Sequence, residues 1–129
     1  RMDSTVISDA VNLAARLEEL TKIYQVRLLI SHHTFLRLSN PGDYGMRLVD
    51  KVNVKGKAKK VTVYEVFDAD PPEIRKAKLA TKTIFEEGLL LYYRDRLSDA
   101  AQRFSECLQV NPGDRVAQHY LKRCQHRMR

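Results

Sequence analysis

The stretch TVISDAVNLAAR, residues 5–16, predicts a short extended segment that leads directly into a helix. Residues 5–7 (Thr-Val-Ile) favour a β conformation, whereas the Ala- and Leu-rich sequence after them favours a helix. We expect that helix to begin at Ser8 or Asp9, either of which can cap its first turn by accepting a backbone N–H. Capping alone is a sufficient structural explanation for these two residues.

Asn12 and Arg16 form a polar pair within the same helix. They are four residues apart, so their side chains lie on one face. An Arg guanidinium is a planar fork that matches phosphate oxygens, and Asn can hydrogen-bond a sugar or orient the Arg. If the pair projects into a cleft at the strand end, it predicts a nucleotide or phosphate site. In an exposed helix the same pair would need no special explanation.

The residues around this stretch predict an α+β fold with a mostly antiparallel sheet. Strands are expected at 26–31, 46–54 and 61–67, the last two joined as a β-hairpin by the lysine-rich segment 55–60. A short helix is expected from Ser31 or His32 to Leu38. Apolar residues recur at helical spacing within the helix over 9–24 and should face the core: Ala10, Leu13, Ala14, Leu17, Leu20 and Tyr24.

The second half of the chain predicts only helices. The segment DADPPEIRKAK, residues 68–78, interrupts the earlier pattern and predicts a boundary, with a linker at 71–78 between parts 1–70 and 79–129. Helices are expected at about 79–94, 98–110 and 115–127. Between residues 81 and 114, small, aromatic and turn residues stand at offsets that resemble one 34-residue tetratricopeptide repeat: Gly88, Ala100, Phe104 and Pro112. A plain helical hairpin is the alternative.

The composition suits a packed fold, and its positive charge would suit an anionic partner, although a solvated helical surface in the second half of the chain explains the basic excess as well. The 129 residues are 43% hydrophobic and 30% charged, with a net charge of +7. Residues 1–70 hold 11 Lys and Arg against 9 Asp and Glu, and residues 71–129 hold 12 against 7. No signal peptide or membrane-spanning run is recognised, so a cytoplasmic location is expected. The sequence starts with Arg rather than Met, so upstream residues are expected, which could include an anchor. The two cysteines, Cys107 and Cys124, are expected to be buried thiols.

Two motifs together resemble a known family. MDSTVISDAVNLAARLEELTKIYQVRLLIS (residues 2–31) and VNVKGKAKKVTVYEVF (residues 52–67) are similar to the C-terminal half of a class III adenylate/guanylate cyclase catalytic domain. The resemblance covers residues 1–67 and implies a ferredoxin-like fold, here followed by a helical-repeat tail. One position departs from the family pattern, since Ser8 stands where the family usually has Gly. Ser is also a good N-cap, so its effect is left open.

The resemblance implies roles for four residues. Thr5 would help to read the purine base, favouring ATP over GTP, and Asn12 would contact and orient the ribose. Arg16 would stabilise charge that develops on the phosphates, and Lys55 would hold the β- and γ-phosphates. The implied reaction is attack of the ribose 3′-hydroxyl on the α-phosphate, which expels pyrophosphate and forms the 3′,5′-cyclic nucleotide.

The resemblance also implies that the site is incomplete. The family binds two Mg²⁺ or Mn²⁺ ions through a pair of Asp residues in the N-terminal half of the domain, and no segment of this sequence matches them. We therefore expect a chain that is inactive alone and that completes its site with a second cyclase domain, as in a homodimer. The alternative is a non-catalytic module whose helical tail binds a protein. Nucleic-acid binding is disfavoured, because no stacking platform or recognition motif is present.

Overall fold

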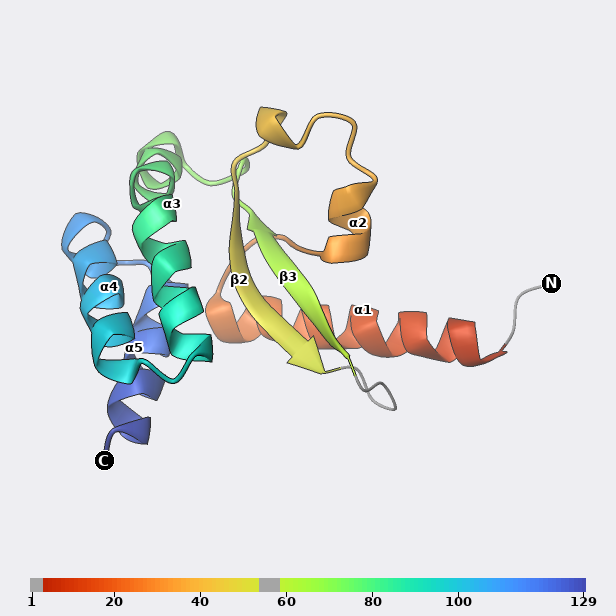
Figure 1. Cartoon of the computed structure of the whole chain (residues 1–129). Helices are drawn as coiled ribbons and strands as arrows, with labels where there is room; N and C mark the ends of the chain where they lie inside the picture. Colours follow the sequence, from red (N-terminus) through yellow and green to blue (C-terminus); the bar gives the residue numbers. More distant parts are fainter. Residues whose placement is uncertain (1–3, 54–58) are drawn as a thin grey trace.

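The computed structural model describes residues 4–53 and 59–129. This part of the chain contains five α-helices, a short 3₁₀ helix and three strands (Figure 1), so the predicted α+β class is confirmed. In chain order the elements are α1 (Ser4–Tyr24), β1 (Leu29–Ser31), α2 (His32–Leu36), η1 (Pro41–Asp43), β2 (Met46–Asn53), β3 (Lys60–Val66), α3 (Pro72–Tyr93), α4 (Leu97–Val110) and α5 (Arg115–Arg127).

The sheet is antiparallel and has the order β1-β3-β2. The expected hairpin of β2 and β3 is confirmed, with Val52 opposite Val61 and Met46 opposite Val66. A β-bulge interrupts the ladder between Leu48 and Asp50. Because one extra residue enters β2 there, the strand bends and the side chains beyond the bulge are re-aimed.

The strand β1 is shorter than the 26–31 expected from the sequence. Gln25 takes a left-handed conformation with φ of 51°, and the N–H of Val26 donates to the carbonyl of Thr21 at 3.1 Å. These residues therefore complete the C-terminal turn of α1 and are not available for the sheet.

The expected extended segment at residues 5–7 is wrong. The helix α1 already begins at Ser4, so these residues are helical. A strand needs a neighbour for its backbone N–H and C=O groups, and in residues 4–53 and 59–129 no strand pairs with 5–7. Continuing the helix satisfies those groups within the segment itself, which overrides the β preference of Thr, Val and Ile.

The helix α3 begins at Pro72 rather than near residue 79, so the expected linker at 71–78 is helical for most of its length. Pro71 and Pro72 lie in the segment that predicts a break. Proline is, however, favoured at the first position of a helix, because the N–H that it lacks would have no partner there. Lys78 within this segment is buried. The division of the chain into two domains stays a prediction.

The helices α3 and α4 pack closely at Gly88, as the repeat-like spacing predicts. A Cβ placed on Gly88 would lie 2.9 Å from Cε1 of Phe104 and 3.2 Å from Cβ of Arg103. Phe104 and Ala100 are both fully buried, and Pro112 follows the end of α4. The close packing of α3 on α4 is therefore as expected. The assignment of these helices to the tetratricopeptide class stays a prediction.

One hydrophobic cluster joins the sheet to the helices. It includes Val49 and Val63 from the strands, Phe85 from α3, Phe104 from α4 and Tyr120 from α5. Figure 1 shows α3–α5 gathered at one side of the sheet, while the N-terminal half of α1 extends away from the sheet on the opposite side. Burial follows this arrangement along α1: Leu20 and Tyr24 are buried and Leu13 and Leu17 partly so, but Ala10 and Ala14 are exposed.

Candidate functional site

The helix α1 carries the predicted polar pair. Asn12 and Arg16 both lie within its regular part and are partly buried, four residues apart and therefore on the same face. Nη1 of Arg16 donates to Oε1 of Glu19 at 2.9 Å, and the two side chains are 40% and 60% exposed. An exposed ion pair of this kind contributes about 0–1 kcal/mol. Glu19 thus holds Arg16 only weakly, and an anionic ligand could replace it.

The other two predicted site residues cannot be placed beside this pair. Lys55 lies outside the described residues, and so does Lys57. Thr5 belongs to α1, one turn or more before Asn12, and its side chain is likewise outside what the structure describes. Asn12 and Arg16 line neither the cavity beside Tyr120 nor those beside Asp114 and Phe67. The structure therefore brings together only two of the four predicted residues.

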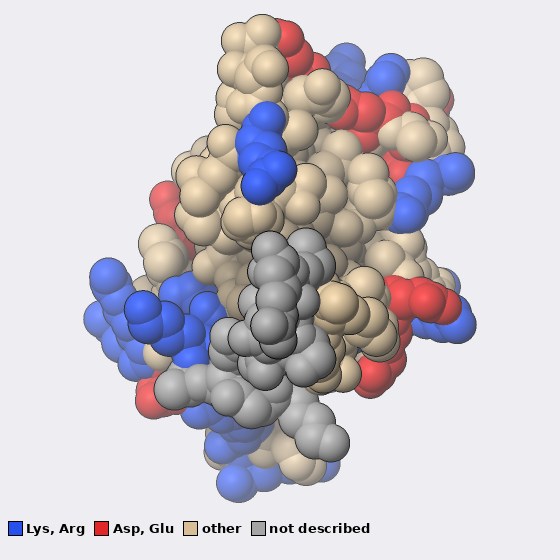
Figure 2. Space-filling view, turned by 90° about the vertical axis from the view of Figure 1, so that its right-hand side faces the viewer, with Lys and Arg blue, Asp and Glu red and all other residues tan. Residues whose placement is uncertain are grey.

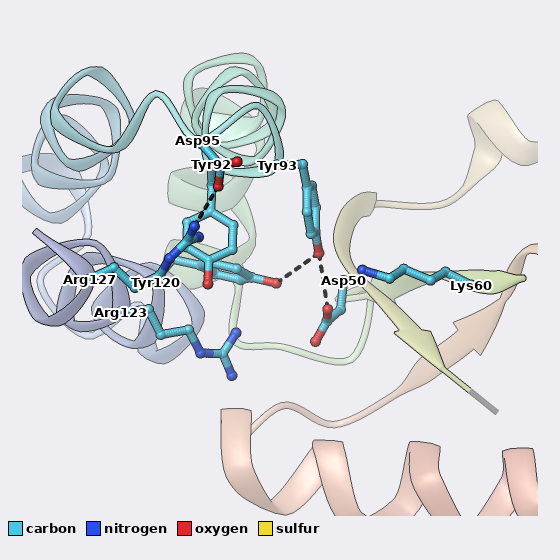
Figure 3. Close-up of a pocket in the computed structure, with 8 residues that line it drawn as sticks. All are labelled: Asp50, Lys60, Tyr92, Tyr93, Asp95, Tyr120, Arg123 and Arg127. Carbon is cyan, nitrogen blue, oxygen red and sulfur yellow. Dashed lines mark hydrogen bonds and ion pairs between the residues drawn. The ribbon is translucent and has the colours of Figure 1, made fainter. Parts of the chain in front are cut away.

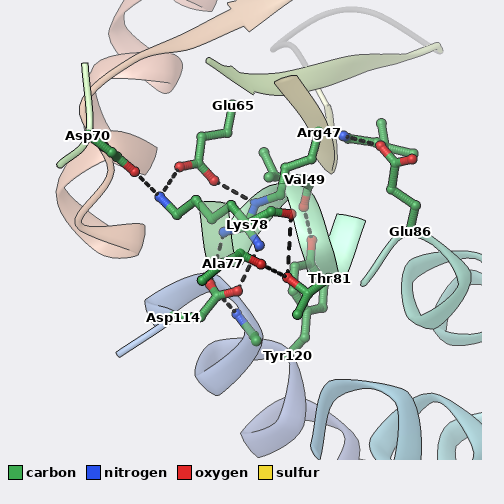
Figure 4. Close-up of polar contacts among 12 residues, drawn as sticks. Arg47, Val49, Glu65, Asp70, Ala77, Lys78, Thr81, Glu86, Asp114 and Tyr120 are labelled. Atoms are coloured by element: carbon green, nitrogen blue, oxygen red, sulfur yellow. Dashed lines mark hydrogen bonds and ion pairs between the residues drawn. The ribbon is translucent and has the colours of Figure 1, made fainter. Parts of the chain in front are cut away.

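Sequence reasoning missed a buried ionic network between the sheet and the helices (Figure 4). Arg47 of β2 donates from Nε to Glu65 of β3 at 2.7 Å, and from Nη1 and Nη2 to Asp114 at 2.7 and 2.9 Å. Nζ of Lys78 lies 2.5 Å from Oε2 of Glu65 and 2.5 Å from Oδ2 of Asp70. Three carboxylates thus neutralise two buried cations, and each cation bridges two of them.

Asp114 serves two purposes in this network. Its side chain accepts the N–H of Ala117 at 3.2 Å, which caps α5, while both of its oxygens accept from Arg47. Burial alone would raise the pKa of Asp114, but the hydrogen bonds and charge of Arg47 outweigh it and hold that pKa below its ordinary value. In the turn sequence NPGD, residues 111–114, an Asp directly before a helix indicates an N-cap. No feature of the sequence indicates that Arg47 is the ionic partner of Asp114.

A second polar cluster ties the end of α1 to the helices. The hydroxyl of Tyr24 donates to Oδ2 of Asp50 at 2.5 Å, and that of Tyr93 donates to Oδ1 at 3.1 Å. Nη1 of Arg123 in α5 donates to the Tyr24 hydroxyl at 3.1 Å. Burial, helped by the negative charge of Asp50, raises the pKa of Tyr24 to about 12. The helix that carries Asn12 and Arg16 is thus anchored at its C-terminal end by β2, α3 and α5.

The described residues do not fit the metal ions that the resemblance implies. Within 4–53 and 59–129, no group of three or more His, Cys, Asp or Glu side chains could hold a metal ion. The acidic residues that do converge, such as Glu65 and Asp70, face Lys78 and Arg47 instead. No step of a reaction can therefore be assigned to a metal held by these residues.

The surface charge is mixed on the face that Figure 2 shows. Lys and Arg lie at the lower left, at the bottom and at the upper right, and Asp and Glu are interspersed with them on both sides. His32 and His33 are exposed at the start of α2, and Nδ1 of His32 lies 2.9 Å from the Tyr64 hydroxyl. Among the described residues, no helix is both long enough and apolar enough to cross a membrane.

The chain is similar to two curated proteins named as adenylate cyclases. It is 38% identical over 125 residues to "Adenylate cyclase, terminal-differentiation specific" of Dictyostelium discoideum, a match that covers 96% of this chain and 6% of that protein. It is 51% identical over 67 residues to the adenylate cyclase of Anabaena cylindrica, covering 51% of this chain and 13% of that protein. The chain thus spans only a small part of either relative. No protein-family model matches it, and no solved structure does. These homologues support a cyclase fragment.

Proposed function

We propose that the chain is the C-terminal part of a class III nucleotidyl cyclase catalytic domain that makes 3′,5′-cyclic AMP and pyrophosphate from ATP for intracellular signalling in the cytoplasm. The observation that carries this proposal is the 38% identity to a protein named adenylate cyclase over 96% of the chain. Since that match spans 125 residues, it includes helices of the C-terminal part as well as the sheet. The ferredoxin-like arrangement of the complete domain belongs to the same proposal.

Asn12 and Arg16 are the catalytic residues in this proposal. Their shared face on α1 supports it, because a ribose and an adjacent phosphate could meet both side chains at once. Asn12 hydrogen-bonds and orients the ribose, so that its 3′-hydroxyl faces the α-phosphate. Arg16 leaves Glu19 and donates to phosphate oxygens as their negative charge grows during the attack.

Thr5 and Lys55 complete the substrate contacts. Thr5 contacts the purine base, and Lys55 holds the β- and γ-phosphates that leave as pyrophosphate. The position of Lys55 in the connection between β2 and β3 places it on a different element from α1. Substrate would thus be held between a helix and a hairpin of the same chain. Lys57, Lys59 and Lys60 add only a general positive field near this connection.

The remaining half of the site comes from a second cyclase domain, supplied by a homodimer of the parent protein. The Mg²⁺ or Mn²⁺ ions would be bound by acidic residues of that second domain, because the described residues of this chain offer no group that could hold them. The ions would supply Lewis-acid stabilisation of the phosphates. This chain alone is therefore inactive.

The experiment that tests the proposal is complementation. The chain is incubated with ATP and Mn²⁺, first alone and then mixed with a cyclase domain that carries the acid pair but has its own Asn and Arg positions replaced. We expect cyclic AMP only from the mixture, and less cyclic GMP when GTP is supplied instead. Robust cyclic AMP from the chain alone would refute its incompleteness, and none from either sample would refute the catalytic role.

A second candidate function is a non-catalytic module that binds a protein through its helical part. It is favoured by one observation: neither Asn12 nor Arg16 lines the cavity beside Tyr120, the one beside Asp114 or the one beside Phe67. In this case α3 and α4, which meet at Gly88 in the manner of a tetratricopeptide repeat, present a surface to a protein partner. A mixture that forms no cyclic AMP but retains a partner through α3–α5 would favour this function.

A further inference from the structure

A cavity of 340 Å³ lies between the hairpin and the helical part of the chain (Figure 3). Its walls come from β2, β3, the C-terminal end of α3, the loop residue Asp95 and α5. The residues that line it are Asp50, Lys60, Tyr92, Tyr93, Asp95, Tyr120, Arg123 and Arg127. Neither Asn12 nor Arg16 is among them, so the cavity is distinct from the predicted catalytic pair.

The acidic residues of the cavity are already compensated. Oδ1 of Asp50 accepts the N–H of Lys51 at 2.7 Å and the hydroxyl of Tyr93, and Oδ2 accepts the hydroxyl of Tyr24. Asp95 pairs with Arg127 at the rim, with 2.5 Å between Oδ1 and Nη2. Each carboxylate thus has hydrogen-bond donors of its own, and Asp95 also has a cation in direct contact.

Two cations of the cavity have no carboxylate in direct contact. In residues 4–53 and 59–129, neither Arg123 nor Lys60 forms an ion pair with a carboxylate. Nη1 of Arg123 donates to the neutral hydroxyl of Tyr24, and Asp50 attracts the guanidinium without touching it. Figure 3 shows Arg123 and Lys60 on different walls, from α5 and β3. The cavity therefore combines three cations, two of them without a direct ion-pair partner, with two carboxylates and several hydroxyl groups, so its formal charge is positive by one.

The aromatic rings limit what the cavity can bind. Tyr120 stacks on Phe104 with ring centroids 5.3 Å apart, and Arg123 lies 4.8 Å from its centroid, so both of its faces have contacts. Arg127 lies 5.2 Å from the centroid of Tyr92, and Lys51 5.2 Å from that of Tyr93. Little ring surface is left for a planar base to stack on. The ligand that fits is a compact anion with several oxygens rather than a nucleobase.

We propose that this cavity binds a small phosphate-bearing polyanion of diphosphate size, with Arg123 and Lys60 as its principal ligands and Arg127 at its rim. Phosphate oxygens would accept the N–H groups of Arg123 and of the Lys60 ammonium from two sides. The proposal rests on the cavity and its charges, and it holds whether or not the chain takes part in cyclic nucleotide synthesis.

The test is calorimetric titration of the chain with inorganic pyrophosphate. We expect saturable binding that added salt weakens, because the contacts are ionic. Arg123→Gln and Lys60→Gln should each weaken binding about tenfold, since each removes a charged hydrogen-bond donor. Lys60 is exposed, so its substitution should leave folding intact. If Arg123→Gln proves unstable, the effect of Lys60→Gln on pyrophosphate binding still tests the proposal.

A further variant makes the result specific. Arg37→Gln removes an exposed charge at the end of α2, away from the cavity, and should leave binding unchanged. The proposal is overturned if pyrophosphate does not bind, if Lys60→Gln has no effect, or if Arg37→Gln weakens binding equally. Arg16→Gln tests whether the anion binds at the predicted catalytic pair instead, and complete loss of binding in this variant would also overturn the proposal.

Discussion

Arg47 and Asp114, 67 residues apart in the chain, form a two-pronged ion pair whose side chains are both completely buried. The pair links β2 to the N-cap residue of α5. Because Glu65 and Lys78 extend it to β3 and α3, two helices and two strands share one charge network. Removing one partner would leave the others buried and uncompensated, which is far more costly than losing an exposed pair.

Asp114→Asn should destabilise the chain by about 3 kcal/mol. Asn is as good an N-cap as Asp, so the substitution keeps the cap on α5 and removes only the charge that faces Arg47. Urea unfolding followed by circular dichroism measures the change. The control is Asp99→Asn, which removes an exposed pair with Arg96 and should cost less than about 1 kcal/mol. Equal effects of the two substitutions would contradict the importance of the buried network.

The stability of the chain should fall at acid pH in a way that depends on Asp114. Its pKa is lowered in the folded state relative to the ordinary 3.8, so its contribution is fully present above about pH 4 and is lost as the pH falls through the folded pKa. The free-energy difference between wild type and Asp114→Asn should therefore shrink between about pH 5 and pH 3. Unfolding curves at these pH values test this; a difference independent of pH would be evidence against the shift.

Gly88→Ala should destabilise the chain by about 1–2 kcal/mol, although alanine is the better helix former. The added methyl would lie 2.9 Å from the ring of Phe104, which is buried and held by its stacking on Tyr120. Gly113→Ala is the matched control, since nothing lies within 4 Å of its added Cβ. Thermal unfolding compares the two; a Gly88→Ala variant as stable as wild type would show that α3 and α4 can separate freely.

The thiols of Cys107 and Cys124 should not react with Ellman's reagent in the folded chain at neutral pH. Both are buried, as the sequence predicted, and burial raises the pKa of each thiol, that of Cys107 to about 12 with a contribution from the charge of Asp114. Both should react after denaturation. A thiol that reacts rapidly in the native chain would contradict the burial of α4 or α5.

The parts of the fold that could be predicted depend on local signals. Alternating residues and a lysine-rich connection identified the hairpin, and the helical spacing of Gly88 and Phe104 identified a close helix pair. The start of α3 was misplaced because Pro72 permits a helix start as well as a break. The extended segment at 5–7 was misplaced because a strand depends on a neighbour that local sequence does not reveal.

The candidate site could be predicted less completely than the fold. The spacing of Asn12 and Arg16 fixes their shared face, but no local pattern says what that face meets. The partners of Arg47 and Asp50 come from distant elements, and the bulge beside Asp50 changes which side chains share a face of β2. Contacts between residues far apart in the chain, such as Arg47 with Asp114 and Asp50 with Tyr93, leave no periodic signal in the sequence. The two polar networks and the cavity could therefore be found only in the structure.

In the proposed function, Arg16 stabilises the charge that develops on the substrate phosphates when this chain pairs with a second cyclase domain. The most direct test is the rate of cyclic AMP formation by that mixture when the chain carries Arg16→Ala. We predict a loss of about a hundredfold, because a charge-stabilising donor is removed. Lys22→Ala, which removes another exposed, ion-paired cation of α1, should leave the rate unchanged. If the mixture with Arg16→Ala were as active as the mixture with the wild-type chain, the proposed catalytic role of Arg16 would be contradicted.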